Sequence, residues 1–350
     1  MTPAGRATPT DWRTITYVFF AGVAAAIILA KGSAAAPAVR QEMALELAQI
    51  GWLMSISNLA TLLFGTVAGQ FGIRFGLPTM VKTGLAIMTL AALGSLFASN
   101  FPTLLAGRTL EGIGIVLFTV AAPSWIASLA EEKDRAMAMG VWALWMPVGS
   151  VIIMLLSPLL IAAGGWRALW LVSALCTAGA WLLIVKARQT GQQQPGGQFD
   201  LSALRRLAPW LLAATFACFS FQFFSVFTFL PLYFTSELKV ADATAAGLVS
   251  IIPFMIIPGN LLGGLLAKKG IAPWQLILFP AVIMLLLTQL LFSLTTTGST
   301  AYVILACYGF FLGIIPTAIF IQAPRLATSA AAAAPINGLG MSGQGLGILL

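Results

Sequence analysis

The stretch GQFGIRFGLPTMVK, residues 69–82, decides the fold class because it is a short polar break between two long apolar runs. The preceding run, Ile50–Gln70, has about the 20 mostly apolar residues that a membrane-spanning helix needs. A second apolar run, Thr83–Ala98, follows the break. The pattern indicates a tight connection between two membrane helices. The break contains two glycines and a basic residue between them: Gly69, Arg74 and Gly76.

A similar stretch, GGLLAKKG, occurs at residues 263–270. It repeats the two glycines seven residues apart, Gly263 and Gly270, with the basic Lys268 two residues before the second glycine. The offset between the two copies is 194 residues, since 263 minus 69 and 270 minus 76 both give that value. Many secondary transporters consist of internal repeats, so this spacing indicates a duplicated membrane half.

Both stretches resemble the signature loop of the major facilitator superfamily, approximately G-x-x-x-D-R-x-G-R-R between helices 2 and 3, with a weaker copy between helices 8 and 9. The glycines and Arg74 fit, whereas Ile73 occupies the acidic position, and Leu77 and Pro78 replace the distal basic pair. The resemblance implies an all-α polytopic membrane protein with two pseudo-symmetric six-helix halves. It also implies a cytoplasmic gate, which links the halves through charge pairs. The gate residues are Gly69, Arg74, Gly76, Gly263, Lys268 and Gly270. The acidic member of the usual charge pairs is absent, because Ile73 occupies its position.

The composition excludes an ordinary soluble protein, because 59% of the residues are hydrophobic and 8% are charged, against about 25% charged in soluble domains. The net charge is +8, but no basic cluster is interleaved with aromatic residues, so we expect lipid contact and no nucleic-acid partner. The absence of histidine excludes a His-based triad and an imidazole relay. We expect no metal or cofactor, and small packing roles for the three cysteines within apolar runs: Cys176, Cys218 and Cys307.

Eleven apolar runs are candidate membrane helices. Six of them lie at residues 14–37, 50–70, 83–98, 103–129, 136–163 and 168–185. Five more lie at residues 209–234, 245–267, 274–294, 301–323 and 336–350. The first run resembles a signal peptide, but about ten further runs follow it, so we expect an uncleaved spanning helix.

The segment RQTGQQQPGGQ, residues 188–198, cannot build a packed core and predicts a flexible linker. We therefore divide the chain into an N-terminal half at 1–187, a cytoplasmic linker at 188–208 and a C-terminal half at 209–350. With the N-terminus in the cytoplasm, thirteen of the eighteen Lys and Arg residues lie on the cytoplasmic side. These are Arg6, Arg13, Arg74, Lys82, Lys133, Arg135, Lys186, Arg188, Arg205, Arg206, Lys268, Lys269 and Arg325. We expect a monomeric multi-pass protein of the inner (plasma) membrane.

The last run, 336–350, is short: its 15 residues span about 22 Å of helix, against roughly 30 Å of hydrocarbon. The resemblance implies twelve helices, so we expect a chain truncated within helix 11.

Three charged residues lie in or near the hydrocarbon and are therefore candidates for substrate binding or coupling: Lys31, Arg108 and Glu111. Arg108 and Glu111 are three residues apart, on one helix face, and are expected to pair. The resemblance implies a link to proton coupling for a basic residue before a glycine-rich run in helix 4; the alternative is a structural ion pair. For Lys31 we expect snorkelling to the outer headgroups rather than anion attraction.

Neutral polar and aromatic residues are the remaining candidates, and their alternative roles are interhelical hydrogen bonds or lipid-facing packing. They are Asn58, Trp142, Trp145, Gln222 and Asn260. Pro147 and Gly149 are expected to loosen the fifth helix. The drug-antiporter signature G-x-x-x-G-P-x-x-G-G is absent there, whereas GRTLEGIG, AAPSWIA and WALWMPVGS resemble the cyanate-permease-like branch.

The main hypothesis is transport of a small solute by alternating access, with a small organic or inorganic anion as substrate and protons as coupling ions. The alternatives are a drug/proton efflux antiporter, and a membrane sensor that keeps the fold without transport. An integral-membrane enzyme is disfavoured because the sequence contains neither H-E-x-x-H nor G-x-S-x-G.

Overall fold

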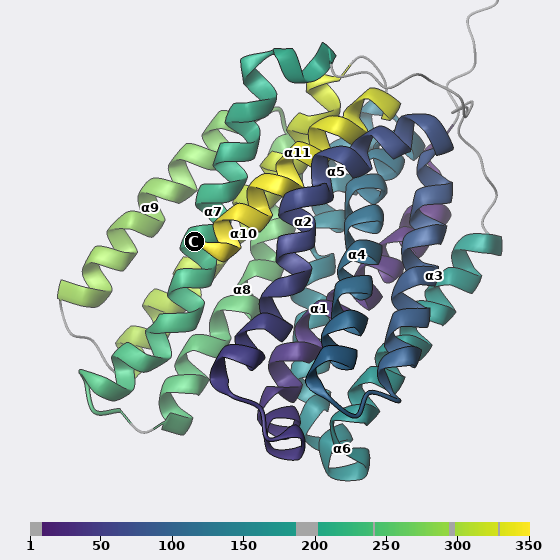
Figure 1. The fold of residues 1–350 in the computed structure, drawn as a ribbon. Helices are drawn as coiled ribbons and strands as arrows, with labels where there is room; N and C mark the ends of the chain where they lie inside the picture. Colours follow the sequence, from purple (N-terminus) through teal and green to yellow (C-terminus); the bar gives the residue numbers. More distant parts are fainter. Residues whose placement is uncertain (1–8, 187–201, 241, 294–297, 328–329) are drawn as a thin grey trace, which may run out of the picture.

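The structure is a computed structural model that describes residues 9–186, 202–240, 242–293, 298–327 and 330–350. Within these ranges the chain forms a helical bundle without strands (Figure 1). The first half of the bundle comprises α1 (Trp12–Met43), α2 (Leu47–Phe75), α3 (Leu77–Ser95), α4 (Phe101–Leu129), α5 (Glu132–Ala143) and α6 (Trp145–Lys186). The second half comprises a 3-10 turn (Ser202–Arg205), α7 (Leu207–Ser236), α8 (Asp242–Lys268), α9 (Pro273–Ser293), α10 (Gly298–Leu326) and α11 (Ala330–Leu349).

Nine helical stretches of the described residues are long and apolar enough to cross a membrane. Eleven were expected; residues 132–186 count as one stretch, and α11 is not among the nine. Large apolar side chains face outward, with Leu159 70% and Leu286 63% exposed. Such a surface is unfavourable in water but suits lipid, and it confirms the prediction of a polytopic all-α membrane protein.

The fifth and sixth predicted segments have different boundaries in the structure. α6 runs through both, but Gly164 and Gly165 have non-helical backbone angles, and Gly165 has a φ of +64° that favours glycine. The fifth segment consists of α5 and the first part of α6, with the break at Leu144. Pro147 lies in the first turn of α6, where proline is tolerated. The interruption of the helix that we predicted at Pro147 and Gly149 is instead at Leu144, between α5 and α6.

The last helix is longer than predicted. α11 has 20 residues instead of 15, because the alanine run before Pro335 is helical and the proline lies inside the helix. Alanine is the best helix former, which accounts for this extension. Of the predicted linker, residues 188–201 lie outside the described ranges, and α7 begins at Leu207.

The two signature loops share a positive φ at their second glycine. Gly76 connects α2 to α3 with a φ of +83°, and Gly270 follows α8 with a φ of +91°. Both values lie in the region that glycine adopts without steric cost. The sequence repeat therefore corresponds to a repeat of structure.

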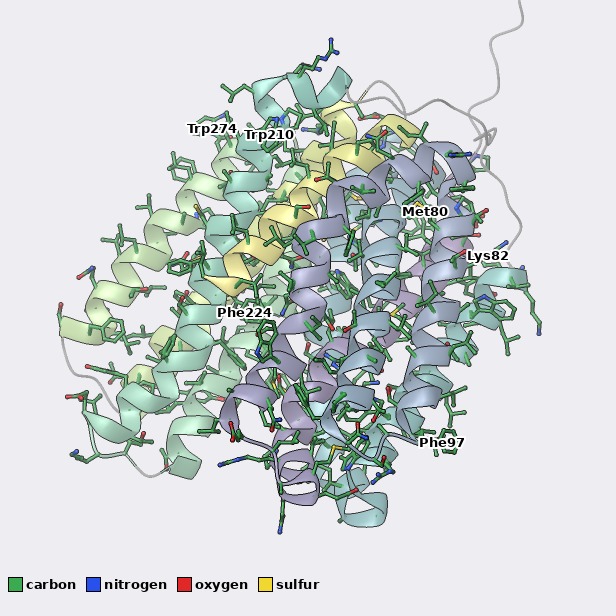
Figure 2. All side chains as sticks on the ribbon, in the orientation of Figure 1. Met80, Lys82, Phe97, Trp210, Phe224 and Trp274 are labelled. Atoms are coloured by element: carbon green, nitrogen blue, oxygen red, sulfur yellow. The ribbon has the colours of Figure 1, made fainter. Side chains whose placement is uncertain are left out.

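Aromatic and charged residues mark the two ends of the bundle. In Figure 2, Trp210 and Trp274, which begin α7 and α9, lie near the same end as Lys82 in α3. Phe97, just after α3, lies near the opposite end and is 86% exposed. The end at which α2 and α8 terminate is named the closed end here, because contacts between the halves gather toward it.

Close backbone contacts between the halves occur in two of the helix pairs near the closed end. α11 lies against α2 (Figure 1), and a Cβ atom added to Gly69 would lie 2.5 Å from the Pro335 Cα. α5 lies against α8, and a Cβ atom added to Gly140 would lie 3.0 Å from the Gly264 Cα. Helices in membranes associate closely where residues are small, so these glycines permit contact between the two backbones.

The charge distribution predicts that the closed end faces the cytoplasm. In a background with Cys176, Cys218 and Cys307 replaced by alanine, two exposed positions make a matched pair: Thr79 in the first turn of α3 and Ser99, four residues after the helix ends. An impermeant thiol reagent added to intact cells should label Ser99→Cys and leave Thr79→Cys unlabelled until the cells are permeabilised. The reverse labelling would invert the topology.

The glycine contact between α5 and α8 predicts that a large residue at Gly140 opens the closed end. In Gly140→Leu, spin labels at the exposed positions Thr79 and Lys269 should lie several ångströms farther apart, because the new side chain meets the α8 backbone. Gly94→Leu is the control, since a Cβ atom there meets no atom within 4 Å. Equal distances in both variants would show that this contact does not hold the halves together.

Candidate functional site

Three charged side chains form a buried cluster inside the first half, named the triad here: Lys31, Arg108 and Glu111. Each is at most 2% exposed. The Lys31 Nζ lies 2.6 Å from Glu111 Oε1, and the Arg108 Nη1 lies 2.6 Å from Glu111 Oε2. One carboxylate therefore pairs with two cations, one at each oxygen.

Lys31 does not snorkel, which corrects the expectation from sequence. Its ammonium group also donates to Ser173 Oγ at 2.8 Å and lies 4.6 Å from the centre of the Trp170 ring. Both partners belong to the part of α6 after the Gly164–Gly165 break. These partners inside the bundle satisfy the ammonium group, so its stem has no need to reach the headgroups.

Arg108 links three helices. Its Nε donates to the Leu53 carbonyl of α2 at 3.2 Å, and its Nη1 donates to the Ile28 carbonyl of α1 at 2.9 Å. Asn100 caps the N-terminus of α4, and the three-residue spacing within that helix puts Arg108 and Glu111 on the same face. Within the described residues, the partners of the triad all belong to the first half, on α1, α2, α4 and α6.

An aromatic cluster lies where the two halves meet. Trp142 stacks on Trp145 at 5.4 Å between ring centres and contacts Phe118 of α4 and Phe320 of α10. Trp142 is fully buried, and its Nε1 has no hydrogen-bond partner among the described residues. Lipid-facing packing, the alternative considered for these tryptophans, is therefore wrong.

Polar side chains also cross between the halves. Asn260 of α8 donates to the Ala143 carbonyl at 3.1 Å. Asn337 of α11 donates to Ser124 Oγ of α4 at 2.6 Å, a buried contact that the sequence analysis missed. In the sequence, Asn337 is a polar residue among alanines and glycines, and this pattern could have indicated a buried contact between helices. Asn58 packs differently, with its backbone carbonyl against Gly345.

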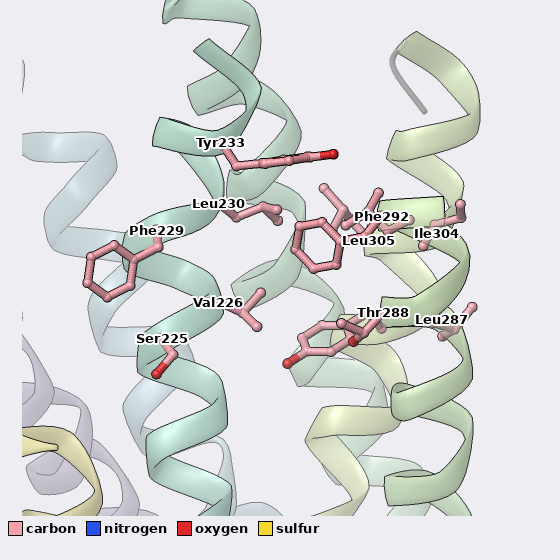
Figure 3. Close-up of a pocket in the computed structure, with 12 residues that line it drawn as sticks. Ser225, Val226, Phe229, Leu230, Tyr233, Leu287, Thr288, Phe292, Ile304 and Leu305 are labelled. Atoms are coloured by element: carbon pink, nitrogen blue, oxygen red, sulfur yellow. The ribbon is translucent and has the colours of Figure 1, made fainter. Parts of the chain in front are cut away.

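The second half contains a cavity at the place that corresponds to the triad. It has a volume of about 370 Å³ between α7, α9 and α10, with mostly apolar walls (Figure 3). Adding the 194-residue offset to Lys31 and Glu111 gives Ser225 and Leu305, and both line this cavity. The pseudo-symmetry therefore pairs an ionic cluster in one half with an apolar cavity in the other.

Gln222 of α7 is partly buried and lies near Tyr308, which lines this cavity. The buried Tyr308 hydroxyl has no hydrogen-bond partner among the described residues. Gln222 does not join the triad or the aromatic cluster in any described contact.

The predicted gate residues do not form one cluster. Lys268 lies 3.7 Å from Asp134 of the first half, which gives a charge pair between the halves. Arg74 is exposed and lies over the Phe75 ring. Gly263 packs within the second half, where an added Cβ atom would lie 3.1 Å from the Ile314 carbonyl oxygen.

The remaining sequence expectations concern cysteines and metals. Cys218 and Cys307 are exposed, so the expected packing role is wrong for these two, whereas Cys176 is partly buried. In the described part of the chain, no group of three or more Cys, Asp or Glu residues is arranged to hold a metal ion.

Known proteins resemble this chain in sequence. It is 29% identical over 153 residues to the Major facilitator superfamily multidrug transporter mfsC of Aspergillus fumigatus, which covers 43% of this chain and 29% of that protein. It is 26% identical over 134 residues to the Arabinose-proton symporter of Escherichia coli, which covers 38% of this chain and 28% of that protein. The matched part is thus less than a third of either relative.

Solved structures resemble it over nearly its whole length. The transporter FucP in the outward conformation superposes with a TM-score of 0.78 at 17% identity, covering 96% of this chain and 89% of that one. The proton:xylose symporter XylE gives 0.77 at 15% identity, covering 96% and 86%. Residues 14–350 match the sequence profile described as Major Facilitator Superfamily, so this chain belongs to that family of membrane transporters.

Proposed function

We propose that the protein is a proton-coupled secondary transporter that moves a small solute by alternating access. The observation that carries this proposal is the contact between the halves near the closed end, through the glycines of α2, α5, α8 and α11. Two halves that rock about a site between them expose that site to each side in turn. The resemblance to FucP in the outward conformation supports a state in which the closed end is cytoplasmic.

The proposed solute site lies between the halves beside Trp142. The unpartnered Nε1–H is a donor that suits a hydrogen-bond acceptor, and Trp145 and Phe320 supply aromatic surface. A buried donor without a partner is costly, so a ligand that accepts its hydrogen bond is favoured. A small organic or inorganic anion fits this chemistry, and the resemblance of helices 4 and 5 to the cyanate-permease-like branch points the same way.

The proposed coupling group is Glu111. As a carboxylate it holds Lys31 and Arg108, and on protonation it loses the charge that both cations require. Arg108 also binds carbonyl groups of α1 and α2, so a change at Glu111 alters contacts among three helices of the first half. We propose that the protein works as a monomer in the inner membrane with its N-terminus in the cytoplasm.

Drug/proton efflux is the second candidate, because relatives include a multidrug transporter and a methylenomycin A resistance protein of Bacillus subtilis. Uptake into proteoliposomes with an imposed pH gradient distinguishes the two functions. The substrates tested are small monocarboxylates and inorganic anions for the first function, and methyl viologen for the second. Accumulation of an anion supports the first function, and transport of methyl viologen alone supports the second.

Removal of the Glu111 carboxyl group is expected to uncouple transport from protons. The sharpest comparison is Lys31→Met with the double variant Lys31→Met and Glu111→Gln. The double variant keeps the triad at a net charge of +1, as in the natural protein, where two cations and one carboxylate also give +1. The single variant should still accumulate solute against a gradient, whereas the double variant should exchange solute without accumulating it.

Solute flux and the fluorescence of a pH dye inside proteoliposomes provide the two readouts. Glu132→Gln is the control, because Glu132 is 75% exposed and pairs with Arg135 at the surface. Proton-driven accumulation by the double variant would remove Glu111 from the mechanism.

The triad also predicts an order of stabilities. Glu111→Gln leaves two buried cations without a counter-ion, so it should destabilise the protein by about 3–5 kcal/mol. Lys31→Met leaves the Arg108–Glu111 pair intact and should cost clearly less. Thermal unfolding in detergent gives the order, and an equal loss in both variants would contradict it.

A further inference from the structure

One guanidinium nitrogen of Arg108, Nη2, donates no hydrogen bond to the described residues. Nε and Nη1 donate to carbonyl groups and to Glu111, whereas no described residue accepts from Nη2. A Cβ atom added to Gly32 would lie 3.3 Å from Nη2 and 3.6 Å from Cζ. The missing side chain of Gly32 therefore leaves this part of the guanidinium uncovered.

A small cavity is lined by both Arg108 and Gly32. It has a volume of about 10 Å³, and its walls come from α1, α2, α4 and α6. They include Gly32, Ala36, Met54, Leu104 and Trp170. A space of about this size holds one particle as large as a water molecule, and the flexible Met54 side chain can adapt to a slightly larger one.

The charge around the cavity is unbalanced. Two cations and one carboxylate give the triad a net charge of +1, and each Glu111 oxygen already pairs with one cation. Within the described ranges, no other acidic side chain pairs with Lys31 or Arg108. An excess charge in a medium of low dielectric constant is costly and attracts a counter-ion.

We propose that this cavity binds one small monovalent anion, of the size of chloride, on Nη2 of Arg108. The anion neutralises the excess charge of the triad, and the apolar walls exclude larger polyatomic anions. All the cavity walls belong to the first half, so the anion remains within that half and is distinct from a solute bound between the halves. The inference does not depend on the proposed transport function.

Thermal unfolding of the purified full chain in detergent tests the site without any transport assay. The chain is titrated with sodium chloride while sodium gluconate keeps the ionic strength constant, because gluconate is too large for the cavity. A saturable rise of the melting temperature is expected, of about 2 °C or more at ten times the dissociation constant. A melting temperature that is the same in both salts would overturn the proposal.

Two variants separate this site from a general salt effect. Gly32→Ala places a methyl group next to Nη2 and keeps every charge, and Lys31→Met makes the triad neutral at a residue that does not itself line the cavity. Both should lose the chloride response, whereas Gly94→Ala, on an open face of α3, should keep it. A response that persists in Gly32→Ala would place the anion elsewhere and refute the proposal.

Crystals grown in bromide locate the anion directly. An anomalous peak within hydrogen-bond distance of Arg108 Nη2 is the expected result. A chloride response together with a bromide peak only at other places would also refute the assignment.

Discussion

A single carboxylate that pairs with two cations in the membrane interior is the constraint on which the first half depends. Glu111 holds Lys31 of α1 and Arg108 of its own helix at 2.6 Å each, and Arg108 continues to a carbonyl group of α2. Charges in hydrocarbon are stable only with such partners. The triad therefore fixes the helices of the first half to one another, as the proposed movement of one half against the other requires.

The interface between the halves is built for close contact. Gly69 and Gly140 bring α2 and α5 against the α11 and α8 backbones, with the Asp134–Lys268 pair at 3.7 Å at the margin. Small residues let the helix backbones of the two halves approach closely, and two buried hydrogen bonds, from Asn260 to the Ala143 carbonyl and from Asn337 to Ser124, add polar contacts between them. The two pseudo-symmetric halves differ in their interiors: the first contains an ionic cluster where the second has an apolar cavity.

The fold class was predictable because apolar runs of spanning length and a repeated glycine spacing are local features of the sequence. The pairing of Arg108 with Glu111 was equally accessible, since three residues along one helix fix their distance. The burial of Lys31 was not, because Ser173 lies 142 residues away along the chain and only tertiary packing brings it to the ammonium group. The extent of α11 was missed for a local reason, since its proline lies within the helix.

α4 is the element that connects the triad with the contacts between the halves. Phe118 lies seven residues after Glu111, about two turns along the same face, and it packs against Trp142. Ser124, farther along α4, accepts a hydrogen bond from Asn337 of the second half. A change in the charge of Glu111 acts on a helix that also borders the aromatic cluster and bonds to α11. α4 thus contacts the triad, the aromatic cluster and α11, and it is the element through which the proposed coupling at Glu111 would reach the second half.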